Sequence, residues 1–447
     1  MRNTARRGAG LRRRRLMAVS LTGLAVLAAG CRGGGEDPAD GGDGGGDVAT
    51  DVGVTSEPCP DAVNADNGCI YLGTLSDLTV GPFAAAGPLI IEGQEAFWNR
   101  VNEDGGIGGY DVDVTEYVRD NQYNPQVTNQ VYQEIKPDVL ALAQTLGSPM
   151  TAAIVDDLDA EDIIAAPAAW SSLYLFQDVI VESGASYCAE AMNGVDYAVE
   201  NDGIQSVMAI HYAGDYGADA AAGAKVAAEA NGIEFTNVET TAGADNQAAA
   251  IAAIREQAPD LVLISTGPTE TATIVGQAVA GGFQGRVMGS SPTWNPAILQ
   301  SPAAPAFQAA FQHLGPWGPW DAETDGHAAA LEALGDVQPN EFYLAGWFWS
   351  YPLKAALEAA AENGDLTRAG LREAAEGLEE IDFEGVLPEG TGNYAGGANE
   401  AASRATYISA IDPAASTGLA PVAEAYTGPT VEAYEFTGPC YEVEDLG

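Results

Sequence analysis

An alternation of short β-rich runs with longer amphipathic segments is the feature that most limits the fold of this chain. Strands are predicted at Ile70–Leu75, Asp111–Val118, Val139–Ala143, Ile163–Ala166, Gln205–His211, Phe235–Glu239, Leu261–Ser265 and Arg286–Gly289. Helices are predicted between them, at about Pro88–Glu103, Ala218–Asn231, Asn246–Gln257 and Glu270–Ala280. This order predicts an α/β fold in which helices cover parallel sheets.

The N-terminus has the features of an export signal. Seven arginines between Arg2 and Arg15 precede the apolar stretch Leu16–Gly30, which is shorter than the roughly 20 residues that a membrane-spanning helix needs. We therefore predict that residues 1–30 are a cleaved signal peptide. The run Arg13–Arg15 leaves open whether export follows the general or the twin-arginine route.

The segment Leu27-Ala28-Ala29-Gly30-Cys31 resembles the lipobox of bacterial lipoproteins, in which the cysteine is acylated and becomes the new N-terminus. The resemblance implies an extracytoplasmic protein anchored to the cell membrane through lipid on Cys31. The alternative is an ordinary secretory signal followed by a chance cysteine. Residues 31–58 are predicted to be this lipidated cysteine and a flexible tether, because they are rich in Gly and Asp and poor in large apolar side chains.

The charge balance limits the partners. The chain has 64 acidic and 18 basic residues and a net charge of −46, which excludes nucleic acid because a phosphate backbone requires a basic surface. The acidity is compatible with an ordinary solvated surface or with a protein kept soluble at high salt.

Four cysteines remain besides Cys31 in an oxidising compartment, and their even number suggests two disulfides. Three pairings are possible. We favour Cys59–Cys69, which would staple the entry to the fold, together with Cys188–Cys440. Zinc is the alternative, but the four cysteines form no CxxC pair and no histidine is near them.

Nothing in the sequence indicates an enzyme. His211, His313 and His327 have no spacing typical of a metal site or a catalytic triad, and no GxSxG, Walker or HExxH motif occurs. We predict no enzymatic activity, no cofactor and no metal.

Parallel sheets bind ligands beyond the carboxyl ends of their strands, so the loops at residues 78–83, 146–150, 167–174, 211–217, 266–270 and 290–294 are the expected binding loops. These loops contain familiar motifs. The segments Gly73–Phe83, Val101–Gly109, Asp120–Pro125, Asp215–Gly217 and Gly364–Arg368, with Gly87, Gly93, Ala96, Tyr343, Gly346 and Trp347, resemble the branched-chain amino acid-type solute-binding proteins of ABC transporters.

The resemblance implies a type I periplasmic binding protein fold, with two Rossmann-like lobes joined by a three-crossing hinge. Lobe 1 would comprise residues 68–187 and 316–405, and lobe 2 residues 188–315 and 406–447. Cys188 would then begin lobe 2 and Cys440 would end near it, which supports their pairing. The implied partners are a small-molecule solute and the permease subunits of an ABC transporter, and the protein is expected to be a monomer.

The family's ligand-binding positions can be placed on this sequence. Ser148 matches the serine that binds the ligand carboxylate, and the alternative is a plain helix N-cap. The next loop supplies Ala168, Ala169, Trp170 and Ser171, where Ala169 replaces a family threonine unless Ser171 substitutes for it. Ser291 stands where amino-acid binders have the acid that pairs with the ligand's ammonium, so an α-amino acid ligand would need another acid.

Further positions complete the expected site. Trp170 and Trp294 could clamp a flat, apolar or cationic group, and Tyr216, Gly267 and Phe83 lie in loops that face the cleft. The sequence therefore predicts a solute-binding lipoprotein of an ABC importer for a small polar solute such as an amino acid, an amide or a related compound. The alternative is a lipoprotein sensor that uses the same trap to signal to a membrane kinase.

Overall fold

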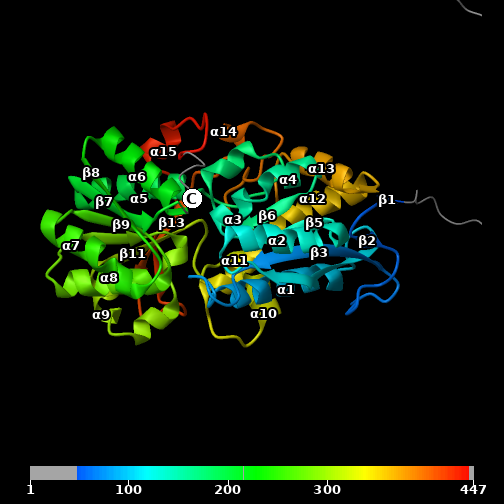
Figure 1. Ribbon diagram of the computed structural model, residues 1–447, viewed down its shortest axis with the longest axis horizontal. Helices are drawn as coiled ribbons and strands as arrows, with labels where there is room; N and C mark the ends of the chain where they lie inside the picture. Colours follow the sequence, from blue (N-terminus) through cyan, green and yellow to red (C-terminus); the bar gives the residue numbers. More distant parts are fainter. Residues whose placement is uncertain (1–47, 215, 442–447) are drawn as a thin grey trace, which may run out of the picture. The chain divides into compact units, whose positions relative to one another are not determined.

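Two sheets dominated by parallel strands organise the chain. The computed structural model describes residues 48–214 and 216–441, and Figure 1 shows their arrangement. The first sheet contains β2 (Val54–Thr55), β3 (Gly68–Ser76), β4 (Tyr110–Asp120), β5 (Ala141–Leu146) and β6 (Ala165–Ala168). The second has the order β14-β13-β11-β10-β9-β7-β8. Its strands are β7 (Ser206–Tyr212), β8 (Glu234–Thr240), β9 (Leu261–Ser265), β10 (Arg286–Gly289), β11 (Phe311–Gly315), β13 (Thr406–Ile411) and β14 (Leu419–Tyr426). These are called the five-stranded and seven-stranded sheets.

All eight predicted strands are present, and the expected α/β fold is confirmed. Within the five-stranded sheet, β3 pairs in parallel with β4 and β5, and β5 pairs in parallel with β6. The seven-stranded sheet departs from the all-parallel expectation, because β13 is antiparallel to β11 and β14 is antiparallel to β13. A further short parallel pair joins β1 (Ala49–Thr50) to β12 (Asp365–Leu366).

Helices cover both sheets. They are α1 (Gly87–Glu103), α2 (Pro125–Ile135), α3 (Ser148–Ala152), α4 (Val155–Ala160), α5 (Tyr187–Asp202), α6 (Tyr216–Asn231), α7 (Ala248–Gln257), α8 (Pro268–Ala280), α9 (Ala304–Ala310), α10 (Asp325–Leu334), α11 (Glu341–Phe348), α12 (Ser350–Glu362), α13 (Arg368–Glu376), α14 (Ala398–Ala401) and α15 (Pro429–Ala433). Helices α1, α2, α3 and α12 contact the five-stranded sheet, and α5, α6, α7 and α9 contact the seven-stranded sheet. Each sheet with its helices forms one lobe.

The chain crosses between the lobes three times. It passes from β6 to β7, returns after β11 to form α10 to α13, and crosses again before β13. The expected three-crossing architecture is therefore present. The residue at which each lobe begins and ends stays a prediction.

Two glycines allow α11 to pack directly on α1. A Cβ atom at Gly93 would lie 1.9 Å from the Tyr343 carbonyl oxygen, and one at Gly346 would lie 1.9 Å from the Ile90 carbonyl oxygen. Neither position can accept a side chain without moving a helix backbone. The contact places the first turn of α11 beside the region where the loops of both sheets meet.

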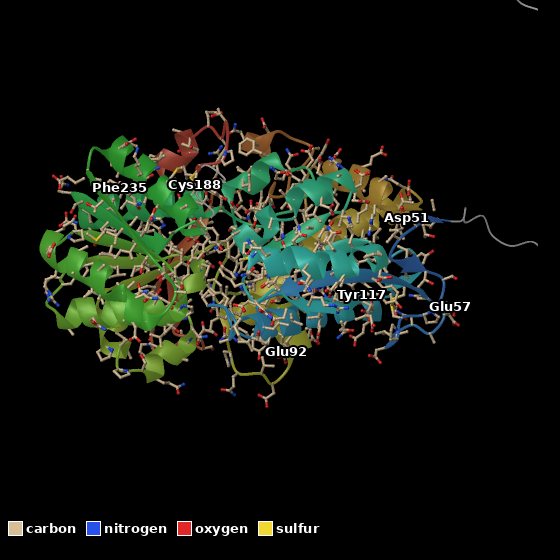
Figure 2. The ribbon with its side chains drawn as sticks, viewed as in Figure 1. Asp51, Glu57, Glu92, Tyr117, Cys188 and Phe235 are labelled. Atoms are coloured by element: carbon tan, nitrogen blue, oxygen red, sulfur yellow. A yellow bond between two sulfur atoms is a disulfide. The ribbon has the colours of Figure 1, made fainter. Side chains whose placement is uncertain are left out.

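Both predicted disulfides are confirmed. Cys59 is bonded to Cys69, and Cys188, at the start of α5, is bonded to Cys440 near the C-terminus (Figure 2). Among the described residues, one group has metal-ligating atoms close together, and it consists of Cys188, Asp219 and Cys440. Because both of its cysteines are oxidised to a disulfide, they offer no thiolate to a zinc ion.

The described residues contain no helix that is long and apolar enough to cross a membrane. The signal peptide, Cys31 and most of the tether lie outside the residues that the structure describes, as does Asp215.

Candidate functional site

A buried pocket lies where the carboxyl ends of strands from both sheets converge. Its wall includes the loop after β5, the loop after β6, the loop after β10, and residues of β11, β13 and α11. The space open to the centre of a water molecule is about 60 Å³. By the same measure a single water requires roughly 10–15 Å³, so the pocket as it stands holds only a small group.

Eight of the ten predicted ligand-binding residues line this pocket: Phe83, Ser148, Ala168, Ala169, Trp170, Tyr216, Ser291 and Trp294. Their roles toward a ligand stay predictions. Within each sheet the loops share an edge because they follow parallel strands, and the pocket forms where the loop edges of the two sheets face each other.

Ser171 and Gly267 are not among the residues that line the pocket. The Ser171 hydroxyl lies 2.9 Å from the hydroxyl of Tyr441 and accepts a hydrogen bond from the backbone N–H of Leu173. Ser171 thus holds the C-terminal segment and the turn that follows it. The backbone N–H of Gly267 donates to the Tyr212 hydroxyl at 2.8 Å, at the entry to α8.

The pocket loops of the five-stranded sheet are held by polar side chains at strand ends. The Asp77 carboxylate accepts hydrogen bonds from the backbone N–H groups of Gly81 and Phe83, both at 2.9 Å, which shapes the loop that carries Phe83. The Asn121 side chain donates to the Leu146 carbonyl oxygen at 3.0 Å, immediately before the Ser148 loop. These bonds explain why an acid and an amide occupy these two positions of the family-like motifs.

Ser148 does not act as a helix N-cap. The N-cap of α3 is Gly147, whose φ of 99° favours glycine, and Ser148 is the first helical residue. The Ser148 side chain is buried, and its hydroxyl has no hydrogen-bond partner among the described residues. A buried hydroxyl without a partner costs roughly 1–3 kcal/mol, which a ligand that hydrogen-bonds to it would recover.

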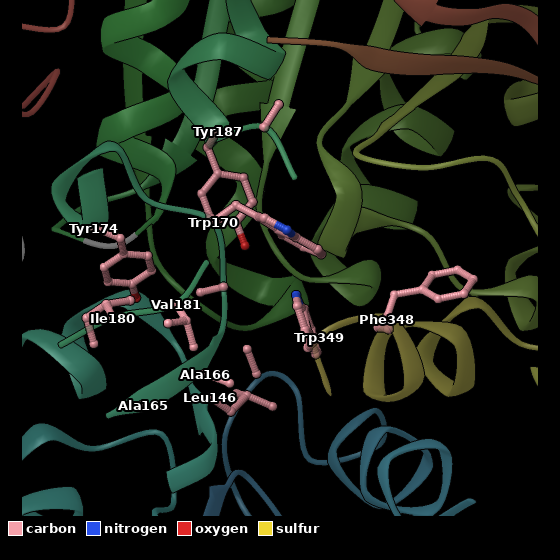
Figure 3. Packing of buried hydrophobic residues seen from close by; sticks show 14 of the residues in the cluster. Leu146, Ala165, Ala166, Trp170, Tyr174, Ile180, Val181, Tyr187, Phe348 and Trp349 are labelled. Carbon is pink, nitrogen blue, oxygen red and sulfur yellow. The ribbon is translucent and has the colours of Figure 1, made fainter. Parts of the chain in front are cut away.

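An aromatic cluster forms one side of the pocket. Trp170 packs against Tyr187, Trp317 and Trp349, with ring centroids 5.8, 5.2 and 4.9 Å away, and Figure 3 shows it between Tyr187 and Trp349. The Trp170 indole N–H donates to the carbonyl oxygen of Ser183. The Trp349 indole N–H is buried without a partner among the described residues, and Trp349 also lines the pocket.

Trp294 belongs to a different cluster. Its ring lies against Phe307 and Phe311, and its indole N–H donates to the Thr417 carbonyl oxygen at 3.0 Å. Trp294 is therefore part of the core under the seven-stranded sheet as well as of the pocket wall. Within residues 48–214 and 216–441, Trp170 and Trp294 make no ring contact with each other.

Glu341 places an acid in the pocket that the sequence interpretation missed. Its Oε1 accepts hydrogen bonds from the Trp320 backbone N–H at 3.1 Å and from the Thr417 hydroxyl. Burial raises the pKa of Glu341 to about 7, and these two hydrogen bonds oppose the rise. The group thus changes charge near neutral pH. Its proximity in sequence to the family-like residues Tyr343, Gly346 and Trp347 is the feature from which Glu341 could have been predicted as a site residue.

His313 is a buried histidine in the pocket wall. Its Nε2 lies 3.1 Å from the Ser291 carbonyl oxygen, and burial lowers its pKa to about 4. The Ser291 backbone N–H is 3.3 Å from the Glu190 carboxylate. An acid thus reaches the Ser291 loop from α5, but Glu190 is not part of the pocket wall. No lysine or arginine belongs to the wall formed by the described residues.

Comparisons with known proteins agree with this geometry. Residues 70–417 match the family described as periplasmic binding protein. None of the curated proteins matches the sequence.

Several solved structures are similar. A fatty acid ABC transporter substrate-binding protein from Thermomonospora curvata has a TM-score of 0.79 and 27% identity over 88% of this chain and 98% of its own. An ABC transporter substrate-binding protein from Aeropyrum pernix has a TM-score of 0.71 and 18% identity over 81% of this chain and 98% of its own. A branched-chain amino acid ABC transporter protein from Thermus thermophilus with bound valine has a TM-score of 0.70 and 18% identity over 82% of this chain and 98% of its own. The last two show the fold alone.

Proposed function

The chain belongs to the periplasmic binding protein family, and we propose that it captures a small, mainly apolar carboxylate for an ABC importer. The observation that carries this proposal is a pair of buried hydrogen-bond donors without partners, the Ser148 hydroxyl and the Trp349 indole N–H, on the wall of one pocket. An indole N–H can only donate, so its partner in a bound state must be an acceptor. A carboxylate offers two acceptor oxygens and can satisfy both donors.

The remainder of the wall indicates the rest of the ligand. It is built mostly from aromatic and aliphatic residues, among them Phe83, Trp170, Trp317 and Leu419. Such a surface favours an apolar group because burying it removes apolar area from water on both partners. The description of the Thermomonospora protein as a fatty acid ABC transporter substrate-binding protein supports this choice.

The ligand would act by joining the two lobes. Ser148 follows a strand of the five-stranded sheet, whereas Ser291 and Trp294 follow a strand of the seven-stranded sheet. A solute that contacts both lobes binds a closed form better than an open one and shifts the equilibrium between them. The transporter then recognises the closed form. We further propose that the protein is a monomer, that it catalyses no reaction on its solute, and that lipid on Cys31 anchors it outside the cytoplasm.

Isothermal titration calorimetry with small apolar carboxylates and the matching primary amides and alcohols tests the proposal. The carboxylate should bind most tightly of each set. Ser148→Ala and Trp349→Phe should each weaken carboxylate binding by about tenfold or more, since a hydrogen bond to a charged group contributes roughly 1.5–3 kcal/mol.

Ser350→Ala is the matched control, because Ser350 is buried next to Trp349 but its hydroxyl already donates to the Gly346 carbonyl oxygen. It should leave affinity unchanged. Equal affinities of the wild type, Ser148→Ala and Trp349→Phe would show that the two donors do not bind the solute.

A further inference from the structure

A second hollow adjoins the pocket. This groove and the pocket share Phe83, Ala86 and Phe342 in their walls. By the measure that gives about 60 Å³ for the pocket, the groove has about 780 Å³. The pocket therefore has room for a head group, and the groove beyond these three residues offers space for the rest of a larger ligand.

The groove wall is uncharged. On one side lies a row of small residues on α8, Ala272, Gly276 and Ala280, which are spaced four apart and so share one helix face. The loop before α1 forms the other side, with Pro82 and Ala85. None of the residues in the wall is acidic or basic, although 18% of the chain is.

An uncharged groove is unusual on a surface that carries so many carboxylates. Charged residues concentrate on protein surfaces, and in this chain acids outnumber bases by 64 to 18. Ala, Gly, Pro, Phe and Ile make up most of the wall and allow close contact with a methylene chain, and the polar side chains among them, Thr269, Thr273, Gln277, Asn295 and Ser301, are all uncharged.

We infer that the groove binds the aliphatic tail of an amphiphilic carboxylate whose head group lies at Ser148 and Trp349. The inference rests on the proposed function for the position of the head. Phe83 and Phe342, which border both hollows, would contact the first methylenes that leave the pocket. The solute class is therefore a medium- or long-chain monocarboxylate, and chain length is what the groove distinguishes.

The dependence of affinity on chain length tests the inference. Butanoate, hexanoate, octanoate, decanoate and dodecanoate are titrated below their aggregation limits, with tryptophan fluorescence and calorimetry as readouts. Full burial of a methylene contributes about 0.8 kcal/mol, which is about fourfold in affinity, and a groove open on one side should give about twofold. The dissociation constant should thus fall two- to fourfold for each added methylene.

Two variants obstruct the groove and leave the pocket intact. Ala272→Trp fills it, and Ala297→Asp adds a charge at an exposed position of its wall. Both should abolish the gain with chain length and leave butanoate binding unchanged. Ala253→Trp on α7 is the matched control, since Ala253 is, like Ala272, a partly buried residue packed on the core of the seven-stranded lobe but lies outside the groove.

The outcomes separate the two proposals. Butanoate binding with no gain for longer chains overturns the groove assignment and leaves the proposed function standing. A gain that persists in both Ala272→Trp and Ala297→Asp also overturns it. If no carboxylate of any length binds, the proposed function fails and the groove assignment fails with it.

Discussion

Replacing Glu341 by glutamine should change the stability of the unliganded protein in a pH-dependent way. Glu341 is held by hydrogen bonds from the Trp320 N–H and the Thr417 hydroxyl to a single carboxylate oxygen. Glutamine has nearly the same volume and keeps a carbonyl oxygen that can accept both bonds. The substitution Glu341→Gln therefore removes the charge with little other change.

The size of the effect follows from the pKa. Burial raises the pKa of Glu341 from 4.5 to about 7, a change that corresponds to about 3 kcal/mol between the protonated and ionised forms. The folded state holds the proton of Glu341 more tightly than the unfolded chain does. The contribution of this proton to the free energy of unfolding is therefore fully present below pH 4.5 and is lost as pH rises through about 7. The glutamine variant does not titrate. Relative to wild type it should gain up to about 3 kcal/mol between pH 4.5 and pH 8.

Urea unfolding at pH 5 and pH 8 measures this difference. Glu384→Gln is a control of opposite sign. Burial acts to raise the pKa of Glu384, but hydrogen bonds from Arg100, at 2.7 Å, and Tyr351 lower it on balance. The ionised form of Glu384 thus stabilises the fold, and its variant should lose stability. The reasoning would be refuted if the free energy of unfolding differed between Glu341→Gln and wild type by the same amount at pH 5 and at pH 8.

Three further predictions concern ligand affinity, the disulfides and the lipid anchor. Affinity for a carboxylate should fall as pH rises through about 7, because ionised Glu341 then repels it, and Glu341→Gln should remove this dependence in calorimetric titrations. Chain entropy predicts that loss of the Cys188–Cys440 disulfide, which spans 252 residues, lowers the free energy of unfolding by about 5 kcal/mol. Loss of Cys59–Cys69, which spans 10 residues, should lower it by about 3 kcal/mol. Denaturant unfolding of the paired Cys→Ser variants measures both losses, and the reverse order would contradict the prediction. Cys31→Ser should move the protein from the membrane fraction to the soluble fraction, and unchanged membrane association after cell fractionation would exclude lipid on Cys31 as the anchor.

Several features of the fold could be predicted because their signals are local. Buried parallel strands appear in a sequence as short continuous apolar runs. Two of them, Leu261–Ser265 and Arg286–Gly289, were predicted with the bounds that the structure shows. The strands β11 and β13 were missed, and so was the antiparallel strand β14. Most of its residues are exposed or half-buried, so it lacks such a run.

In the candidate site, too, some residues could be predicted from local sequence signals and others could not. Sequence alone predicted that Phe83, Ser148 and Trp170, which follow strands of one parallel sheet, would lie at one edge of that sheet. Ser291 follows a strand of the other sheet, and its place opposite them was implied by the family resemblance.

Only the tertiary structure decided what completes the pocket. Glu341 and Trp349 lie in or next to a helix that returns from a later crossing, and they reach the site because Gly93 and Gly346 let α11 lie directly on α1. The structure also decided that Ser171 binds Tyr441, 270 residues away, and does not line the pocket. Such contacts depend on packing between segments distant in the chain, and no local pattern of residues records that packing.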